Sequence, residues 1–213
     1  MGIIKRGILG GFSNKVANVV GTSWKGRAVI KALPLSVANP RTTPQVNQRT
    51  KFSACSKLFS EILGDWVKPL WDRFSGDISG YNAVVKENVA HFETTGIPNY
   101  GALVMSKGKM ATPSIDTIVA DVSLGTVVTL VDLPADAAWG GSGLQVFVLA
   151  INENSGNVLG VAVGTGNSGG SSTVTINSTD FEVGDEVIVF VALKRADGTQ
   201  VSPSFQSAII AIA

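Results

Sequence analysis

The sequence predicts a mainly β fold with a short α-helical segment, and two observations lead to that prediction. Glycine and β-branched residues alternate near the N-terminus and again over the C-terminal half, with 24 Gly among 213 residues, whereas a central stretch repeats its apolar residues at helical spacing. The charge also changes sign along the chain. We therefore expect three parts: a basic extended arm at 1–40, a helical segment at 41–98 and an acidic β domain at 99–213.

The charge is unevenly distributed, although the formal net charge of the whole chain is only +1. Residues 1–60 contain ten Lys or Arg and no acidic residue, so this segment is formally +10, and the first acid is Glu61. Residues 61–110 hold five basic and six acidic groups, which gives −1. Residues 111–213 hold two basic and ten acidic groups, which gives −8. The chain is therefore an electrical dipole along its sequence.

The basic arm has the composition of short extended pieces joined by turns. Glycines recur every few residues over 7–26 with Val and Ile between them, and together with 27–34 this pattern favours an extended arm or a β-hairpin. Neither half holds enough apolar residues to fold alone, so the arm needs a partner surface. The residues that we expect to anchor the arm are Lys5, Arg6, Phe12, Lys15, Trp24, Lys25, Arg27 and Lys31.

A helix is predicted to begin near residue 43, because Thr42 can cap it and Gln45 completes a capping box. Apolar residues then recur at spacings of 3, 4, 3 and 4, which places them on one stripe. This helix core consists of Phe52, Cys55, Phe59, Ile62 and Trp66. Such a stripe is more often ordinary core than a coiled-coil seam. Gly64 is the expected stop. Two shorter helices are predicted at 65–74 and 80–92.

From about residue 103 the pattern changes to short strands separated by turns that contain Gly, Asn or Ser. The strand candidates are 102–106, 115–122, 127–132, 144–151, 158–163, 172–177, 186–194 and 207–212. Asp197-Gly198 is predicted to be a two-residue hairpin turn. Strands of this number and length predict a C-terminal antiparallel immunoglobulin-like β-sandwich, without the Cys and Trp landmarks of antibody domains.

The motifs that suggest chemistry all have simpler interpretations. Gly164-Thr-Gly-Asn-Ser-Gly169 matches the glycine pattern of a dinucleotide-binding loop, but a predicted strand follows it where a helix is required. A glycine-rich hairpin loop is therefore favoured. His91 is the only histidine and Cys55 the only cysteine, and the acids beyond residue 110 are scattered. We predict no catalytic, cofactor-binding or metal site and no enzymatic activity. The longest apolar run, 187–193, is too short for a membrane-spanning helix.

Two kinds of partner suit the basic arm. Cations interleaved with Phe12 and Trp24 can neutralise phosphates and stack bases, which would give sequence-independent nucleic-acid binding through residues 1–60. The alternative is docking on an acidic protein surface, including the acidic domain of a neighbouring copy. Because the arm is rich in Gly, Val and Ile and suits strand addition, protein docking is the favoured interpretation.

Several blocks in the first half of the chain follow a known family pattern. They are Gly7-Ile-Leu-Gly-Gly-Phe-Ser13, Lys15-Val16, Asn18-Val-Val-Gly21, Ser23-Trp-Lys-Gly26, and Ser36-Val-Ala-Asn-Pro-Arg-Thr42 with Gln45, Gln48-Arg49 and Phe52. In these blocks the chain resembles an uncharacterised protein family found in Bacteroidetes and their bacteriophages. The family usually has Gly where this chain has Asn14 and Ala17, which affects the turns of the arm and leaves its role unchanged. It has no established catalytic residues to carry over.

The resemblance and the charge distribution together imply a non-enzymatic bacteriophage virion structural protein. We expect a homo-oligomeric capsid-associated, decoration, spike or fibre-base component, located in the virion and assembled in the host cytoplasm. The expected partners are other virion proteins and copies of the chain itself, and no membrane span is expected. Two alternatives stay open. One is a nucleic-acid-associated protein that binds through the arm, and the other is a bacterial surface adhesion module.

Overall fold

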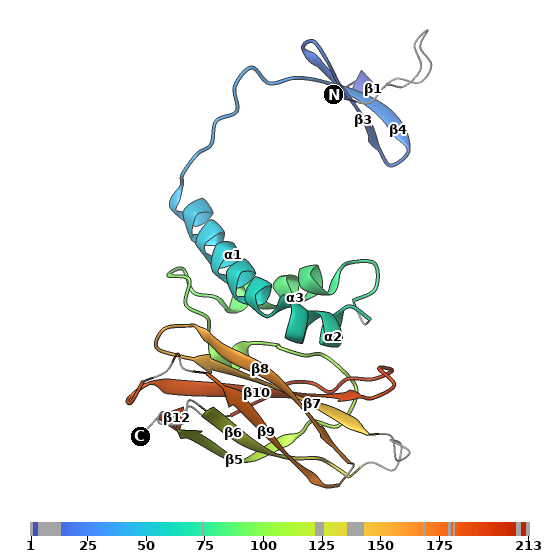
Figure 1. Cartoon of the computed structure of the whole chain (residues 1–213). Helices are drawn as coiled ribbons and strands as arrows, with labels where there is room; N and C mark the ends of the chain where they lie inside the picture. Colours follow the sequence, from blue (N-terminus) through green and yellow to red (C-terminus); the bar gives the residue numbers. More distant parts are fainter. Residues whose placement is uncertain are drawn as a thin grey trace. The chain divides into compact units, whose positions relative to one another are not determined.

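The computed structural model shows a mainly β protein with three antiparallel sheets and a few short helices (Figure 1). It describes residues 2–3, 14–73, 75–121, 126–135, 143–167, 169–178, 180, 182–207 and 210–211. The chain divides into two compact units, Met1–Thr42 and Thr43–Ala213. In the described ranges, the first unit contains one sheet, and the second contains the helices and the other two sheets.

The N-terminal unit is a four-stranded antiparallel sheet with the strand order β1-β4-β3-β2. Its strands are β1 (Gly2–Ile3), β2 (Asn14–Val16), β3 (Val19–Trp24) and β4 (Arg27–Ala32). Two residues with left-handed backbone join β3 to β4, with φ 49° at Lys25 and 74° at Gly26. Positive φ at both central positions matches the twist of a hairpin. The hairpin predicted for the arm is therefore present, and it forms part of a larger sheet.

The N-terminal sheet is a single layer with little apolar core. Among the described residues from 14 to 42, only Gly21 and Val29 are buried. The chain then runs on without regular structure, and Leu35 in that stretch is 99% exposed. Since a sheet gains most of its stability from a covered apolar face, residues 14–42 lack the usual source of stability among themselves.

The second unit begins with helix α1 (Thr43–Glu61), which starts where the sequence predicts. The helix ends close to the stop expected at Gly64, but the chain does not leave its helical path there. It continues through the π-helical turn η1 (Leu63–Val67) into α2 (Lys68–Trp71). The physical reason is burial: Trp66 and Leu70 are almost fully enclosed, and this outweighs the roughly 1 kcal/mol that Gly costs in a helix.

Three shorter helical elements follow. They are α3 (Gly80–Asn88), η2 (Val89–His91) and η3 (Tyr100–Ala102). The first turn of α3 is capped by the Ser79 hydroxyl oxygen, which accepts a hydrogen bond from the Asn82 N–H at 3.3 Å. Within the described part of the chain, no helix combines the length and the apolar character that crossing a membrane requires.

Two antiparallel sheets make up the rest of the second unit. The larger sheet has the order β11-β10-β7-β8 with β12 also paired to β10, and the smaller has the order β5-β6-β9. The strands are β5 (Ser114–Asp121), β6 (Thr126–Asp132), β7 (Leu144–Asn152), β8 (Val158–Gly166), β9 (Ser171–Asn177), β10 (Glu186–Arg195), β11 (Phe205–Gln206) and β12 (Ile210–Ala211). The predicted strands that correspond to β5 through β10 are present, and their ends shift by no more than three residues.

Two predicted features of this region are wrong. Residues 102–106 do not form a strand. The N–H groups of Ala102 and Leu103 donate to backbone carbonyls of the preceding turn, and the Met105 N–H donates to Ser204 Oγ at 3.2 Å. The turn at Asp197-Gly198 is a four-residue loop rather than a two-residue one, because the Arg195 N–H donates to the carbonyl of Gln200 at 3.0 Å. The strand predicted at 207–212 is represented in the described residues by β12.

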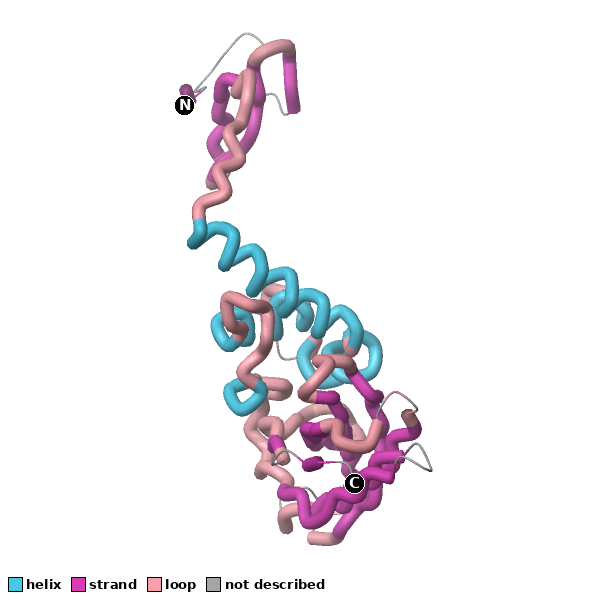
Figure 2. The backbone as a smooth tube through the Cα atoms, turned by 90° about the vertical axis from the view of Figure 1, so that its left-hand side faces the viewer, coloured by secondary structure: helices cyan, strands magenta, loops and turns pink. Residues whose placement is uncertain are grey.

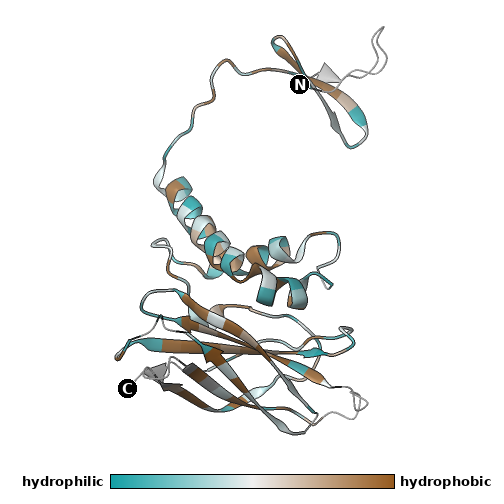
Figure 3. Ribbon diagram, viewed as in Figure 1, coloured by the Kyte–Doolittle hydropathy of each residue, from teal (hydrophilic) through white to brown (hydrophobic). Residues whose placement is uncertain are grey.

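The second unit has three layers, with helices over one face of the larger sheet and the smaller sheet against its other face (Figures 1 and 2). Strands β7 and β10 bury residues on both faces, and Figure 3 shows hydrophobic residues concentrated along them. The helix-side core joins Phe59, Trp66 and Leu70 to Phe147, Leu149 and Phe190. The inter-sheet core joins Val127, Val131, Val174 and Ile176 to Val146, Val148, Val189 and Val191.

Candidate functional site

The cations in the described strands of the N-terminal sheet lie on one of its faces. Directly paired residues of antiparallel strands project to the same face, and successive residues alternate between faces. Lys15 pairs with Val20, which in turn pairs with Lys31. Trp24 is four residues along from Val20 and pairs with Arg27. We call this surface the basic face; it consists of Lys15, Val20, Thr22, Trp24, Arg27, Val29 and Lys31.

An aromatic ring and a further cation lie at one end of the basic face. The Trp24 side chain is 59% exposed, and the Lys25 Nζ lies 5.1 Å from the centroid of its ring. This distance is within the range of a cation–π contact. Beside the ring is a hollow of about 360 Å³. It is lined by Thr22, Ser23, Trp24, Val29 and Lys31.

The opposite face of the N-terminal sheet carries only uncharged residues in β2, β3 and β4. The same pairing rule places Val16, Val19 and Ala32 in one row. We call this surface the uncharged face; in β2, β3 and β4 it consists of Asn14, Val16, Val19, Gly21, Ser23, Ala28, Ile30 and Ala32. Val16 on it is 62% exposed. The two faces therefore offer different chemistry to a partner.

The structure brings together most of the residues that the sequence predicts as the anchoring arm. Lys15, Trp24, Arg27 and Lys31 are exposed on the basic face, and Lys25 is exposed in the adjoining turn. Lys5, Arg6 and Phe12 lie outside the described residues. The separation into two faces could have been predicted from the sequence. The two-residue turn fixes the register of the hairpin, and that register sets Arg27 opposite Trp24.

The predicted helix core is distributed differently from the sequence stripe. Cys55, Phe59, Ile62 and Trp66 are buried in the helix-side core, but Phe52 is 54% exposed and lies outside it. The reason is that the first three turns of α1 are mostly uncovered, so residues of the correct spacing have nothing to pack against there. Leu58, which the stripe omits, is buried instead.

Two indole rings fix the helices to the segment that precedes β5. The Nε1 atoms of Trp66 and Trp71 both donate to the carbonyl oxygen of Met105, at 2.8 and 2.9 Å. Trp66 also meets the ring of Phe147 edge to face, with the centroids 6.3 Å apart. One carbonyl thus uses both of its lone pairs in the buried interior, and the helices are held to the larger sheet.

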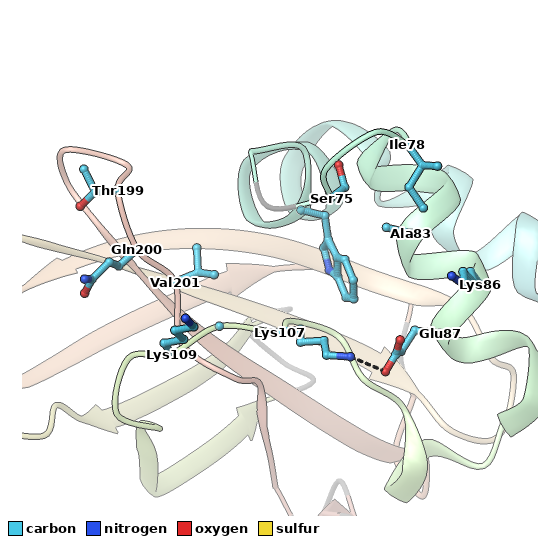
Figure 4. Close-up of a pocket in the computed structure, with 12 residues that line it drawn as sticks. Ser75, Ile78, Ala83, Lys86, Glu87, Lys107, Lys109, Thr199, Gln200 and Val201 are labelled. Atoms are coloured by element: carbon cyan, nitrogen blue, oxygen red, sulfur yellow. Dashed lines mark hydrogen bonds and ion pairs between the residues drawn. The ribbon is translucent and has the colours of Figure 1, made fainter.

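A groove of about 800 Å³ lies between the helices and the loop that follows β10 (Figure 4). Trp71 and Val201 supply apolar surface, and three lysines line the groove: Lys86, Lys107 and Lys109. The Lys107 Nζ is paired with Glu87 Oε1 at 2.8 Å, and both side chains are well exposed. An exposed pair of this kind contributes little to stability. Figure 4 shows the lysines and Gln200 around an open groove.

A second, smaller hollow of about 280 Å³ adjoins α1 and the turn after β7. Tyr100 and Glu153 both line it. Burial raises the pKa of the Tyr100 phenol, and the nearby Glu153 carboxylate raises it further. A phenol with a raised pKa stays protonated at neutral pH, so it can donate a hydrogen bond but is a poor general base.

The groups that could carry catalysis are not gathered in the described residues. His91 lies in η2, and Cys55 lies in the helix-side core, where burial raises the pKa of its thiol to about 11. A thiol with this pKa is almost fully protonated at neutral pH and is therefore a weak nucleophile. In the ranges that the structure describes, no three or more His, Cys, Asp or Glu residues form a group that could hold a metal ion.

The glycine motif at 164–169 serves packing between two sheets. Strand β9 follows it, and the glycines lie where β8 passes close over β9. A Cβ on Gly164 would approach the Val174 Cγ2 to 2.5 Å, and one on Gly166 would overlap the Leu133 side chain. The motif is a link between strands as the sequence predicts, but the strands belong to different sheets, so it does not form a hairpin.

Comparison with known proteins places the chain in a family. A model described as a family of unknown function (DUF6266) matches residues 11–207. The chain belongs to this family. No curated protein matches the chain. The match covers most of the N-terminal unit and nearly all of the second unit, so the family model spans both units.

Proposed function

We propose that this protein is a non-enzymatic structural component of a bacteriophage particle, anchored by its N-terminal sheet to another protein of the particle or to a second copy. One observation carries the proposal. In the described residues the N-terminal sheet is a single layer, and its uncharged face carries exposed apolar side chains, among them Val16 and Val19. Such a sheet gains its missing stability when a partner covers it.

The described anchoring residues predicted from the sequence lie on the basic face or in its turn, but the uncharged face is the better candidate for the protein contact. Ala28 and Ala32 are not buried and leave little side-chain volume, so a partner surface can approach the backbone closely there. Val16 and Val19 supply apolar area at the edge of the sheet. The strand β2 is short and exposed and stands last in the strand order of the described sheet, so a further strand can add at its outer edge.

The three-layer unit then serves as the body that the particle carries or displays. Its two cores make it a rigid block, and residues 111–213 carry a formal charge of −8. The face-to-face packing of the two sheets supports an immunoglobulin-like arrangement, which we include in the proposal. Capsid-associated, decoration, spike and fibre-base positions all suit such a body, and the proposed location is the virion.

The test is to find the protein in particles and then to prevent its incorporation. Mass spectrometry of purified particles should detect the chain in a constant ratio to the major capsid protein. Val16→Asp with Val19→Asp places two carboxylates on the uncharged face, where both side chains are already partly exposed. We expect this double variant to fold and to be lost from particles, because burying unpaired carboxylates at the contact is unfavourable.

A matched control uses the same change on the other unit. Val119→Asp with Val163→Asp replaces two valines that are 60% and 51% exposed, and should leave incorporation unchanged. Absence of the chain from purified particles would overturn the proposal. Normal incorporation of the Val16 and Val19 double variant would show that the uncharged face is not the anchor.

A further inference from the structure

The cations of the N-terminal unit have no carboxylate within their own unit. No acidic residue precedes Glu61, and the unit ends at Thr42. Lys15, Arg27 and Lys31 are all exposed on the basic face, and Lys25 is exposed beside it. Grouping like charges on one face costs electrostatic free energy unless an anion neutralises them. The basic face is therefore a surface arranged for an anionic partner.

The spacing of the basic face suits a flexible chain of negative charges. Lys15 and Lys31 stand on either side of β3, two strand spacings or about 10 Å apart at the backbone. Trp24 and Arg27 lie four residues further along the strands, about 13 Å away. A flexible chain that carries both phosphates and bases can place phosphates at the lysines and a base at the indole within this span.

We propose that the basic face binds single-stranded nucleic acid without sequence preference. Its Lys and Arg side chains contact phosphates, and an unpaired base stacks on Trp24 in the hollow beside Val29 and Lys31. Exposed aromatic rings among cations on a sheet are the usual means of such binding. The proposal is independent of the anchoring function, which uses the opposite face.

Single-stranded nucleic acid fits these observations better than the other anionic partners. A base must be unpaired to expose the ring surface that stacks on Trp24, so a duplex would leave the indole unused. An acidic protein would pair with the lysines but has no need of a 59% exposed indole beside them. The ammonium of Lys25 over the same ring increases the attraction for a chain that carries both bases and phosphates.

The binding test uses the full chain and a fluorescein-labelled thymidine oligonucleotide of about 20 nucleotides, followed by fluorescence anisotropy over a range of salt concentrations. We expect affinity to fall with salt, with a slope in log Kd of about 0.7 per phosphate contact. Lys15→Gln with Lys31→Gln should reduce that slope by about 1.4. The control, Lys68→Gln with Lys86→Gln, removes two exposed lysines of the second unit that lie outside residues 1–60, and should leave the slope unchanged.

The stacking contact is tested separately. Trp24→Leu should weaken binding on the order of tenfold and leave the salt slope unchanged, and Trp24→Phe should restore much of the loss.

The proposal is overturned if the oligonucleotide does not bind at low salt, if the control pair loses as much as the Lys15 and Lys31 pair, or if Trp24→Leu binds normally. Tighter binding of a duplex, or equal displacement by polyglutamate, would assign the face to another partner. Val16→Asp with Val19→Asp should still bind, which separates this result from a failure of the anchoring proposal.

Discussion

Val29 is the one large side chain buried among residues 14–42, whereas strand β7 buries nearly every residue on both of its faces. Both regions are regular antiparallel sheet with complete pairing. Their difference lies in what covers them. Strand β7 lies between helices and a second sheet, and the N-terminal sheet has no second layer in the described residues. Hydrogen-bonded strands alone therefore bury little apolar surface in the described N-terminal sheet.

The energetic consequence is that the second unit can unfold as one block. The N-terminal sheet adds little to the free energy of that unfolding. Each fully buried Val, Leu or Phe of the two cores contributes about 1.5–3 kcal/mol relative to an exposed position. The exposed residues of the N-terminal sheet gain little of this until a partner covers them. The predictions below compare matched positions in the two regions or within one of them.

The largest difference is expected between two tryptophans. Trp66→Ala removes a fully buried ring, its hydrogen bond to Met105 and its contact with Phe147, and should lower the free energy of unfolding by about 3–5 kcal/mol. Trp24→Ala should change it by less than about 0.5 kcal/mol, because that ring is exposed. Urea denaturation followed by far-UV circular dichroism measures both. A large loss at Trp24 would mean that the two regions unfold together.

A smaller loss is expected at Asn88, whose buried amide holds residue 104 against α3. Its Nδ2 donates to the carbonyls of Val84 and Val104, both at 2.9 Å, and its Oδ1 accepts from the Val104 N–H at 2.7 Å. Asn88→Ala leaves backbone groups unsatisfied and should cost about 2–4 kcal/mol. Asn82→Ala, at an exposed position of the same helix, is the control and should be nearly neutral. Equal effects in thermal denaturation would contradict the role of this amide.

The close approach of β8 to β9 gives the next prediction. Gly164→Ala introduces a methyl group against Val174 and should cost about 1–3 kcal/mol. Gly143→Ala is the matched control, because no atom lies within 4 Å of its added Cβ. The midpoint of chemical denaturation distinguishes the two variants. If Gly164→Ala is as stable as the control, the glycines of β8 are not required for packing between the sheets.

The sequence predicted the parts of the fold in which local pattern and burial agree. Strand β9 alternates buried and exposed residues along its whole length, so its period reveals both the strand and its inner face. The spacing of Phe59, Ile62 and Trp66 likewise revealed the buried side of the helices. These features depend on near neighbours in the chain, which the pattern contains.

The parts that the sequence did not predict depend on distant contacts. Residues 102–106 have the sequence pattern of a strand, but Met105 is held by Ser204, which is 99 positions away. Phe52 has the spacing of a core residue, and only the uncovered start of α1 excludes it from the core. The basic face lies between these cases. The sequence identified its cations as residues of the arm, but the pairing of β2, β3 and β4 was needed to show that they share one face.

The smallest effect is expected at a turn of the N-terminal sheet, where backbone strain rather than burial decides. Ala17 lies in the turn between β2 and β3 with φ 52°, a left-handed conformation that costs an L-residue about 1–2 kcal/mol. Ala17→Gly should therefore stabilise this hairpin by up to about 1 kcal/mol after the added flexibility of Gly in the unfolded chain is subtracted. Hydrogen exchange of the β2 and β3 amides should slow by about fivefold. Ala32→Gly in β4 is the control, and should speed exchange because an exposed strand residue gains only flexibility from the change. Slower exchange in both variants would mean that the left-handed turn is not the source of the strain.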